Sequence, residues 1–168
     1  MNVVIRAADE GDIEEMCRIS SLAHLEYGDM IPSSHKMDFL HRYRMSQERQ
    51  EQYSARMKRR LHLSQWRLYV AQLEEKIVGY TLVKMQDDVI LKKGLFVHPE
   101  FQGKGYGSQL FRVSIETLPR GVTVRLLVLE KNARARRLYE QYGFKVTGVN
   151  SELFYGARQV IMEKVIAS

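Results

Sequence analysis

A long apolar run followed by closely spaced glycines constrains this chain more than any other feature of its sequence. The run from Val89 to Val97 predicts a buried strand that ends at His98-Pro99. Gln102-Gly103-Lys104-Gly105-Tyr106-Gly107 follows, and an amphipathic segment begins soon after it. Glycine accepts positive φ and has no Cβ, so successive backbone N–H groups of such a loop can turn toward one anion. The following helix adds unpaired N–H groups and the positive end of its dipole, which predicts a phosphate-bearing cofactor.

Two other interpretations of these glycines stay open at this point. A flexible turn between strand and helix is the simplest, because such turns are often rich in glycine. A dinucleotide-binding fingerprint is the second, since Glu130 closes the next predicted strand where a ribose-binding acid would sit, although Ser108 stands where that pattern requires glycine. A P-loop is excluded, because the sequence contains no Gly-x-x-x-x-Gly-Lys-Ser/Thr.

A second motif follows between Asn132 and Phe144 and reads Asn-Ala-Arg-Ala-Arg-Arg-Leu-Tyr-Glu-Gln-Tyr-Gly-Phe. Together the two motifs resemble the GNAT family of acyl-CoA-dependent N-acyltransferases. The family pattern is Leu-x-Val-x-Pro, then Gln/Arg-Gly-x-Gly-x-Gly, a helix, a strand, and Asn-x-x-Ala-x-x-x-Tyr before Gly-Phe. The resemblance extends from Val89 to Val149. The matching positions are Leu95, Val97, Pro99, Gln102, Gly103, Gly105, Gly107, Asn132, Ala135, Tyr139, Gly143 and Phe144.

The resemblance implies an α/β (α+β) fold, in which a central mixed, mostly antiparallel sheet of about seven strands is flanked by about four helices. It implies acetyl-CoA as the acyl donor and no metal. The strands at 89–97 and 122–128 should splay apart, so that backbone groups of Leu95 and Val97 hold the pantetheine arm while Phe96 points to the opposite face. Lys104 and Arg134 are candidates for the 3′-phosphate of coenzyme A. The predicted cofactor-binding residues are Leu95, Phe96, Val97, Gln102, Gly103, Lys104, Gly105, Tyr106, Gly107, Ser108, Asn132, Arg134 and Ala135.

The reaction implied by the family is direct attack of a neutral primary amine, on a small molecule or a peptide, upon the acetyl-CoA thioester in a ternary complex. Tyr139 is the predicted catalytic residue, because a phenol near the sulfur can give its proton to the departing thiolate. Its alternative role is that of a core tyrosine, since Leu138 and Phe144 make its surroundings apolar. A fold alone does not fix a function, so a non-catalytic acyl-CoA-binding sensor or a nucleic-acid-associated adaptor is the alternative.

The general base is not identified by the sequence. Some members of the family carry a glutamate in the strand before the glycine loop, where this chain has Val89-Ile90-Leu91. Asp87 and Asp88 precede that strand and are typical of a turn. The residues expected to line the pocket and able to act through water are Glu26, Tyr27, His35 and Tyr80.

Hydrophobic periodicity and turn residues predict the other elements. Asp9 should cap the first helix, and a hairpin should turn at Glu74-Glu75-Lys76. We expect strands at 3–5, 68–73, 77–85, 122–128, 144–149 and 159–166, and further helices at 33–62, 110–118 and 132–142. The acceptor pocket should come from 22–61 and from 151–158.

The positive charge is concentrated in one predicted helix. Eight Lys or Arg stand against three Asp or Glu between Ser34 and His62, which accounts for +5 of the net charge of +6. This segment suggests nucleic-acid binding, with Tyr53 stacking on a base, or a solvated helix face above a buried Tyr53, Met57 and Leu61. The second interpretation is preferred, and nucleic acid is not the expected partner. Basic walls near the acceptor pocket would favour an acidic acceptor over a polyamine.

Length and composition predict a single domain spanning residues 1–168. Hydrophobic residues make up 45% of the chain, enough to bury one core. Cys17 is the only cysteine, so no internal disulfide forms, and its apolar neighbours predict a core position. The chain begins without a cleavable signal pattern and has no apolar run near the ~20 residues that cross a bilayer, which predicts no membrane association and a cytoplasmic location. Exposed strand edges near the C-terminus make a homodimer plausible.

Overall fold

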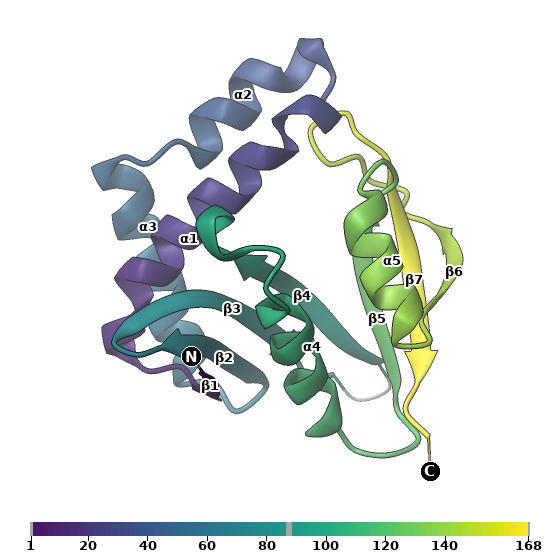
Figure 1. The fold of residues 1–168 in the computed structure, drawn as a ribbon. Helices are drawn as coiled ribbons and strands as arrows, with labels where there is room; N and C mark the ends of the chain where they lie inside the picture. Colours follow the sequence, from purple (N-terminus) through teal and green to yellow (C-terminus); the bar gives the residue numbers. More distant parts are fainter. Residues whose placement is uncertain (1, 87–88, 168) are drawn as a thin grey trace.

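A single seven-stranded sheet organises the fold, in a computed structural model that describes residues 2–86 and 89–167 (Figure 1). The strand order is β1-β2-β3-β4-β5-β7-β6. Only β4 and β5 are parallel neighbours, and every other neighbouring pair is antiparallel, which confirms the predicted mixed, mostly antiparallel sheet. The strands are β1 (Val3–Ala7), β2 (Trp66–Leu73), β3 (Lys76–Lys84), β4 (Val89–Val97), β5 (Thr123–Leu129), β6 (Lys145–Val149) and β7 (Gln159–Val165).

The described residues form five α-helices, one more than expected, because the stretch predicted at 33–62 is divided. Arg44 adopts extended backbone dihedrals, and the Ser46 hydroxyl accepts a hydrogen bond from the Arg49 N–H at 3.1 Å, which caps a new helix. Asp9 caps the short 3₁₀ turn Glu10–Asp12 that leads into the first helix. The α-helices are α1 (Ile13–Leu25), α2 (Ser33–Tyr43), α3 (Gln47–Leu61), α4 (Tyr106–Glu116) and α5 (Ala133–Gln141).

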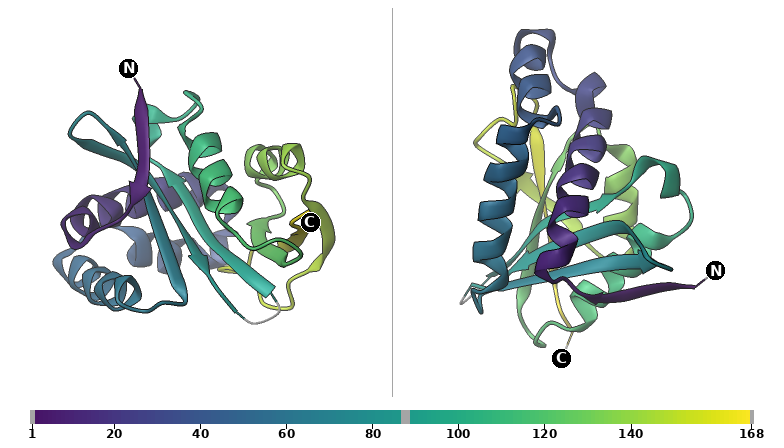
Figure 2. Two further views of the ribbon diagram at one scale, coloured as in Figure 1. Left: turned by 90° about the horizontal axis from the view of Figure 1, so that it is seen from below. Right: turned by 90° about the vertical axis from the view of Figure 1, so that its left-hand side faces the viewer.

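The helices cover both faces of the sheet. α1 and α3 lie against one face of β2 and β3, where the buried Cys17 belongs to the same apolar cluster as Val70 (Figure 2). α4 lies against the opposite face, where Leu110 packs on Val78. α5 lies beside α4 and covers β5 and β7 (Figure 1).

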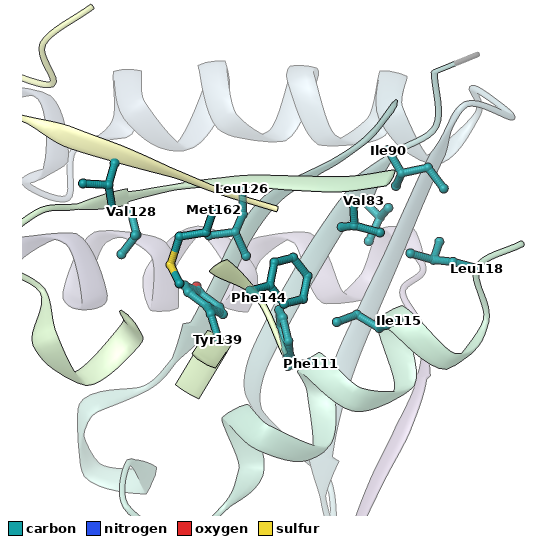
Figure 3. Close-up of a cluster of buried hydrophobic side chains, with 12 residues drawn as sticks. Val83, Ile90, Phe111, Ile115, Leu118, Leu126, Val128, Tyr139, Phe144 and Met162 are labelled. Carbon is teal, nitrogen blue, oxygen red and sulfur yellow. The ribbon is translucent and has the colours of Figure 1, made fainter. Parts of the chain in front are cut away.

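Phe111 joins the two helices that carry the sequence motifs. Its ring centroid lies 5.1 Å from that of Tyr139 on α5 and 5.6 Å from that of Phe144 (Figure 3). It also lies 5.0 Å from the ring centroid of Tyr142, next to α5. Aromatic rings at such separations add to the stability of a core beyond the area that they bury. This cluster therefore packs the middle of α4 against the C-terminal end of α5, although the two motifs are separated in the sequence.

The basic helix α3 is anchored to the core by its apolar face. Tyr53 and Met57 are each 2% exposed and pack against α1 and the sheet, as the solvated-face interpretation predicted. Tyr53 is thus not free to stack on a base. Arg49 is an exception to that interpretation, because it is buried and donates hydrogen bonds to the hydroxyls of Ser21 at 2.6 Å and Ser20 at 3.2 Å.

No helix within residues 2–86 and 89–167 is both long and apolar enough to cross a membrane.

Candidate active site

The sheet opens between β4 and β5. The two strands pair only from Val89–Thr123 to Lys92–Leu126, and beyond this point β4 keeps its pairing with β3 while β5 keeps its pairing with β7. Figure 1 shows the strands diverging toward the glycine loop. The predicted splay is therefore present, and it leaves one edge of each strand without a neighbour.

The backbone of Leu95 and Val97 faces this opening. The His98 N–H donates to the Val78 carbonyl on β3 at 2.9 Å, whereas the Val97 carbonyl accepts a hydrogen bond from the Gln102 side chain at 3.1 Å. Backbone groups alternate in direction along an antiparallel pair, so Leu95 and Val97 both point away from β3. Their side chains lie on the α4 face of the sheet, where Leu95 packs with Leu110.

Phe96 points to the other face, as expected. Its ring centroid lies 4.8 Å from that of His24 on α1 and 5.1 Å from that of Tyr80. Gly94 makes room for this ring, because a Cβ at that position would clash with Cε2 of Phe96. Phe96 therefore packs against α1 and β3 beside the opening.

Two of the three glycines in the loop adopt the positive φ that the sequence predicts. Gly103 and Gly105 have φ of 77° and 83°, and no atom lies within 4 Å of where a Cβ would stand at either position. Gly107 instead lies in the first turn of α4, where a Cβ would be 3.4 Å from Cγ2 of Val97. The left-handed Gly105 is the N-cap of α4, and this is why the helix begins at Tyr106 and not at Leu110 as predicted.

Gln102 connects the loop to two other parts of the opening. Its amide nitrogen donates to Oε2 of Glu26 at 2.6 Å and to the Val97 carbonyl, and its amide oxygen accepts a hydrogen bond of 2.5 Å from Arg134 on α5. A single side chain thus contacts the segment after α1, the end of β4 and the start of α5. Asn132 caps α5 through a hydrogen bond from the Ala135 N–H at 3.1 Å, so this residue orders the second motif.

Two cavities meet at the opening. The first, which we call the glycine-loop cavity, has a volume of about 500 Å³. The second, the strand-gap cavity, has a volume of about 490 Å³ and lies between the diverging strands. Six residues line both, and they are Tyr27, Leu95, Phe96, Asn132, Ala135 and Tyr139.

Nearly all the predicted cofactor-binding residues line the glycine-loop cavity. The exception is Lys104, whose ammonium group lies 5.1 Å from the centroid of the Phe101 ring and whose side chain is not part of the cavity wall. Ser108 does line the cavity, and its hydroxyl also forms a hydrogen bond of 2.7 Å with that of Tyr142. The members of the predicted set that the structure brings together here are Leu95, Phe96, Val97, Gln102, Gly103, Gly105, Tyr106, Gly107, Ser108, Asn132, Arg134 and Ala135.

Tyr139 stands where the two cavities join and is also part of the core. It is 9% exposed and packs against Phe111 and Phe144 (Figure 3). Burial raises the pKa of its phenol above the ordinary value, with a smaller contribution from Tyr27. The phenol is therefore protonated at neutral pH and can donate a proton.

The four side chains considered as bases occupy different places. Glu26 and Tyr27 line the glycine-loop cavity, and Tyr27 also reaches the strand-gap cavity. Tyr80 is 1% exposed and His35 packs near Gly156, and neither belongs to the wall of a described cavity. Asp87 and Asp88 lie outside the described residues.

Sequence reasoning missed several residues of the strand-gap cavity, including His24, Lys92 and Arg125. Nδ1 of His24 lies 2.7 Å from the Ser20 carbonyl, and burial lowers the pKa of the ring to about 4, which keeps it neutral. Among the residues that the structure describes, Lys92 is the only buried lysine, at 6% exposed. One feature of the sequence could have indicated a buried lysine here. Lys92 and Lys93 are adjacent in an otherwise apolar strand, and neighbouring side chains of a strand point to opposite faces.

The strand-gap cavity is basic. Its walls carry Lys92, Lys93 and Arg125, and none of the described residues that line it is Asp or Glu. Arg125 is paired with Glu163 at 2.6 Å, which leaves the two lysines without a carboxylate partner in the part of the chain that the structure describes. The acceptor pocket predicted from 22–61 and 151–158 contributes His24, Tyr27 and Phe154, while β4 and β5 supply most of the remaining wall.

Among residues 2–86 and 89–167, no group of three or more His, Cys, Asp or Glu side chains is arranged to hold a metal ion.

Comparison with solved structures shows the same fold over nearly the whole chain. PaiA N-acetyltransferase from Thermoplasma acidophilum, solved with coenzyme A, has a TM-score of 0.75 and 19% identity over 98% of this chain and 99% of that chain. The ribosomal-protein-S18-alanine N-acetyltransferase from Escherichia coli has a TM-score of 0.74 and 20% identity, covering 99% and 96%. Spermidine N-acetyltransferase from Vibrio cholerae, solved with CoA and spermine, has a TM-score of 0.73 and 17% identity, covering 97% and 95%.

We also compared the sequence with curated proteins and with protein-family models. A search of curated protein sequences finds no match. Residues 64–146 match the model of the acetyltransferase (GNAT) domain, and this range includes the opening of the sheet, the glycine loop and Tyr139. The protein therefore contains an acetyltransferase (GNAT) domain.

Proposed function

We propose that this protein transfers the acetyl group of acetyl-CoA to a primary amine of a small molecule or peptide, by direct attack in a ternary complex. The observation that carries the proposal is the opening between β4 and β5, with the glycine loop at one end and Tyr139 at the junction of two cavities. One cavity suits the donor and the other suits the acceptor. Two substrates held on either side of one opening can react without a covalent enzyme intermediate.

The glycine loop fits a diphosphate. Gly103 and Gly105 turn the backbone through positive φ and leave open space where side chains would stand. The N-terminus of α4 begins directly behind them, and its dipole favours an anion. Arg134 lies at the rim of the same cavity and is the basic residue best placed for a phosphate, whereas Lys104 points away from the cavity wall.

The edge of β4 would hold the rest of the donor. The backbone groups of Leu95 and Val97 face the opening, so they can pair with the amides of the pantetheine arm as a neighbouring strand would. A backbone N–H aimed at the thioester oxygen would stabilise the negative charge that forms there during attack, by roughly 3 kcal/mol in comparable acyl-transfer sites. Tyr139, protonated and next to this edge, would give its proton to the departing thiolate.

The charge of the strand-gap cavity indicates the class of acceptor. Lys93 has no carboxylate partner among the described residues and raises the local positive potential, and the described walls offer no carboxylate to a second ammonium group. A polycation would enter this cavity at an electrostatic cost. We therefore propose an acceptor that carries an acidic group near its reactive amine, such as an amino acid, an amine bearing a phosphate, or an acidic peptide.

Thiol release with a panel of acceptors tests this function. Amino acids and acidic peptides should support release of coenzyme A, whereas spermidine at equal concentration should support little. Acetyl-CoA should also raise the melting temperature, because a ligand that binds only the native state stabilises it. Binding without thiol release for every amine would favour the non-catalytic sensor, and efficient use of spermidine would contradict the proposed acceptor class.

A further inference from the structure

Lys92 is a buried amine with no counter-ion among the described residues. It lies on the last rung of the β4–β5 ladder, opposite Leu126, and is 6% exposed. Its Nζ donates to the Gly94 carbonyl at 3.1 Å and lies 5.6 Å from the centroid of the Phe111 ring. No carboxylate within the described residues lies within 4.0 Å of it. A charged, unpaired ammonium group in such a place lowers the stability of the fold, and a neutral amine avoids most of this cost.

Lys92 lies next to the part of β4 where the thioester is expected to bind. The Gly94 carbonyl that Nζ contacts and the Leu95 N–H that faces the opening belong to the same peptide group. Phe111 contacts both Nζ of Lys92 and the Tyr139 ring, and both residues line the strand-gap cavity. The amine therefore stands at the closed end of the opening, on the side of the sheet that carries the proposed acid.

The other titratable groups of the cavity are poorly suited to accept a proton. From α1 and the turn after it come His24, which has a pKa of about 4, and Tyr27, whose pKa burial raises to about 12. β5 contributes Arg125, which is paired with Glu163 of β7, and α5 contributes the protonated Tyr139. Lys93 on β4 is exposed. α4 and β3 present Phe111 and Thr81, which do not titrate in this range.

Lys92 is buried and matches neutral pH, whereas Lys93 is exposed. Burial lowers the pKa of its ammonium group to about 7, and no charged neighbour contributes to this shift. A proton acceptor works best when its pKa lies near the working pH. The strand that lacks the glutamate of other family members thus carries an amine with suitable basicity one residue after Leu91.

We propose that Lys92 is the general base of this enzyme, an inference that rests on the proposed acetyl transfer. As the C–N bond forms, the attacking nitrogen loses a proton to the neutral Lys92 amine, directly or through one water. As the C–S bond breaks, Tyr139 gives its proton to the thiolate. Transfer of the proton from the Lys92 ammonium to the Tyr139 phenolate then restores both groups, so the cycle needs no other reactant.

The pH dependence of kcat/KM tests this role. The wild-type profile should fall on the acidic side with a midpoint near neutral pH. Lys92→Met keeps the volume but not the amine, and should lower kcat/KM about 100-fold and remove that midpoint. Lys92→Arg keeps the charge without a usable base and should be equally impaired. Lys145→Met, at an exposed position on β6, should retain the wild-type profile.

A second measurement does not depend on any acceptor. NMR of lysine labelled with ¹³C at Cε, in the protein bound to coenzyme A, should show one amine that titrates near pH 7 and is missing from Lys92→Met. Titration of that amine above pH 9, a wild-type pH profile in Lys92→Met, or accumulation of acetylated Lys92 in mass spectra would each overturn the proposal. Failure of the wild-type protein to bind coenzyme A would instead reject the acetyl transfer itself.

Discussion

The Arg134 guanidinium, at the start of α5, donates a hydrogen bond of 2.5 Å to the side-chain oxygen of Gln102, at the start of the glycine loop. These residues belong to different motifs and meet at the rim of the glycine-loop cavity. The contact connects the two sides of the opening, because Gln102 also holds the end of β4. A phosphate bound at the loop would lie next to a cation whose position is already defined.

Replacement of Arg134 by alanine should weaken the binding of acetyl-CoA. Loss of one charge-assisted contact of about 1 kcal/mol corresponds to a fivefold higher Kd, with little change in kcat. Titration calorimetry with coenzyme A measures the change. Arg137→Ala removes an exposed arginine from the same helix and serves as the control. Equal affinities of the two variants would contradict a phosphate contact at Arg134.

Replacement of Gly105 by alanine should reduce both stability and cofactor affinity. The φ of 83° costs an alanine roughly 1 kcal/mol, and its methyl group would project into the space left open for a phosphate. Gly121 has a φ of 81° and equally open surroundings, but it lies outside both cavities. Gly121→Ala should therefore lose similar stability in urea unfolding while its Kd for coenzyme A is unchanged. If both variants bound coenzyme A more weakly, the loss of affinity would come from backbone strain and not from a blocked phosphate site.

Replacement of Tyr139 by phenylalanine should separate catalysis from binding. The aromatic ring keeps its contacts with Phe111 and Phe144, whereas the proton donor is lost, so kcat should fall about 100-fold with a similar Kd for acetyl-CoA. Steady-state kinetics and calorimetry measure the two quantities. Tyr53→Phe removes a hydroxyl from another buried tyrosine, which lines neither cavity, and should leave kcat unaltered. An active Tyr139→Phe enzyme would make Tyr139 a core residue only.

The stability of the protein should rise with pH in a way that depends on Lys92. Its pKa is about 7 in the folded state and near 10.4 in an unfolded chain, so between pH 7 and 9 the unfolded state binds more protons. The free energy of unfolding then increases with pH, by about 2 kcal/mol over this range. The difference in unfolding free energy between wild type and Lys92→Met should change by that amount from pH 7 to 9 in urea titrations. Lys145→Met should show no such change, and a constant difference for Lys92→Met would indicate a charged lysine.

The sequence determined the sheet, the glycine loop and the second motif, because each depends on local chemistry. Apolar runs gave the strands their positions, and glycine at 103 and 105 permits the positive φ that the loop adopts. Helix boundaries were less accurate, since one serine hydroxyl at Ser46 was enough to start a new helix.

Only the tertiary structure decided how these parts meet. The burial of Lys92 and Arg49, the neutral His24 and the contact between Gln102 and Arg134 all depend on packing between segments distant in the sequence. Periodicity tells which face of an element is apolar, but not whether a charged side chain lies at the end of a strand pair where solvent is excluded. That exclusion of water makes an ordinary lysine into a candidate base.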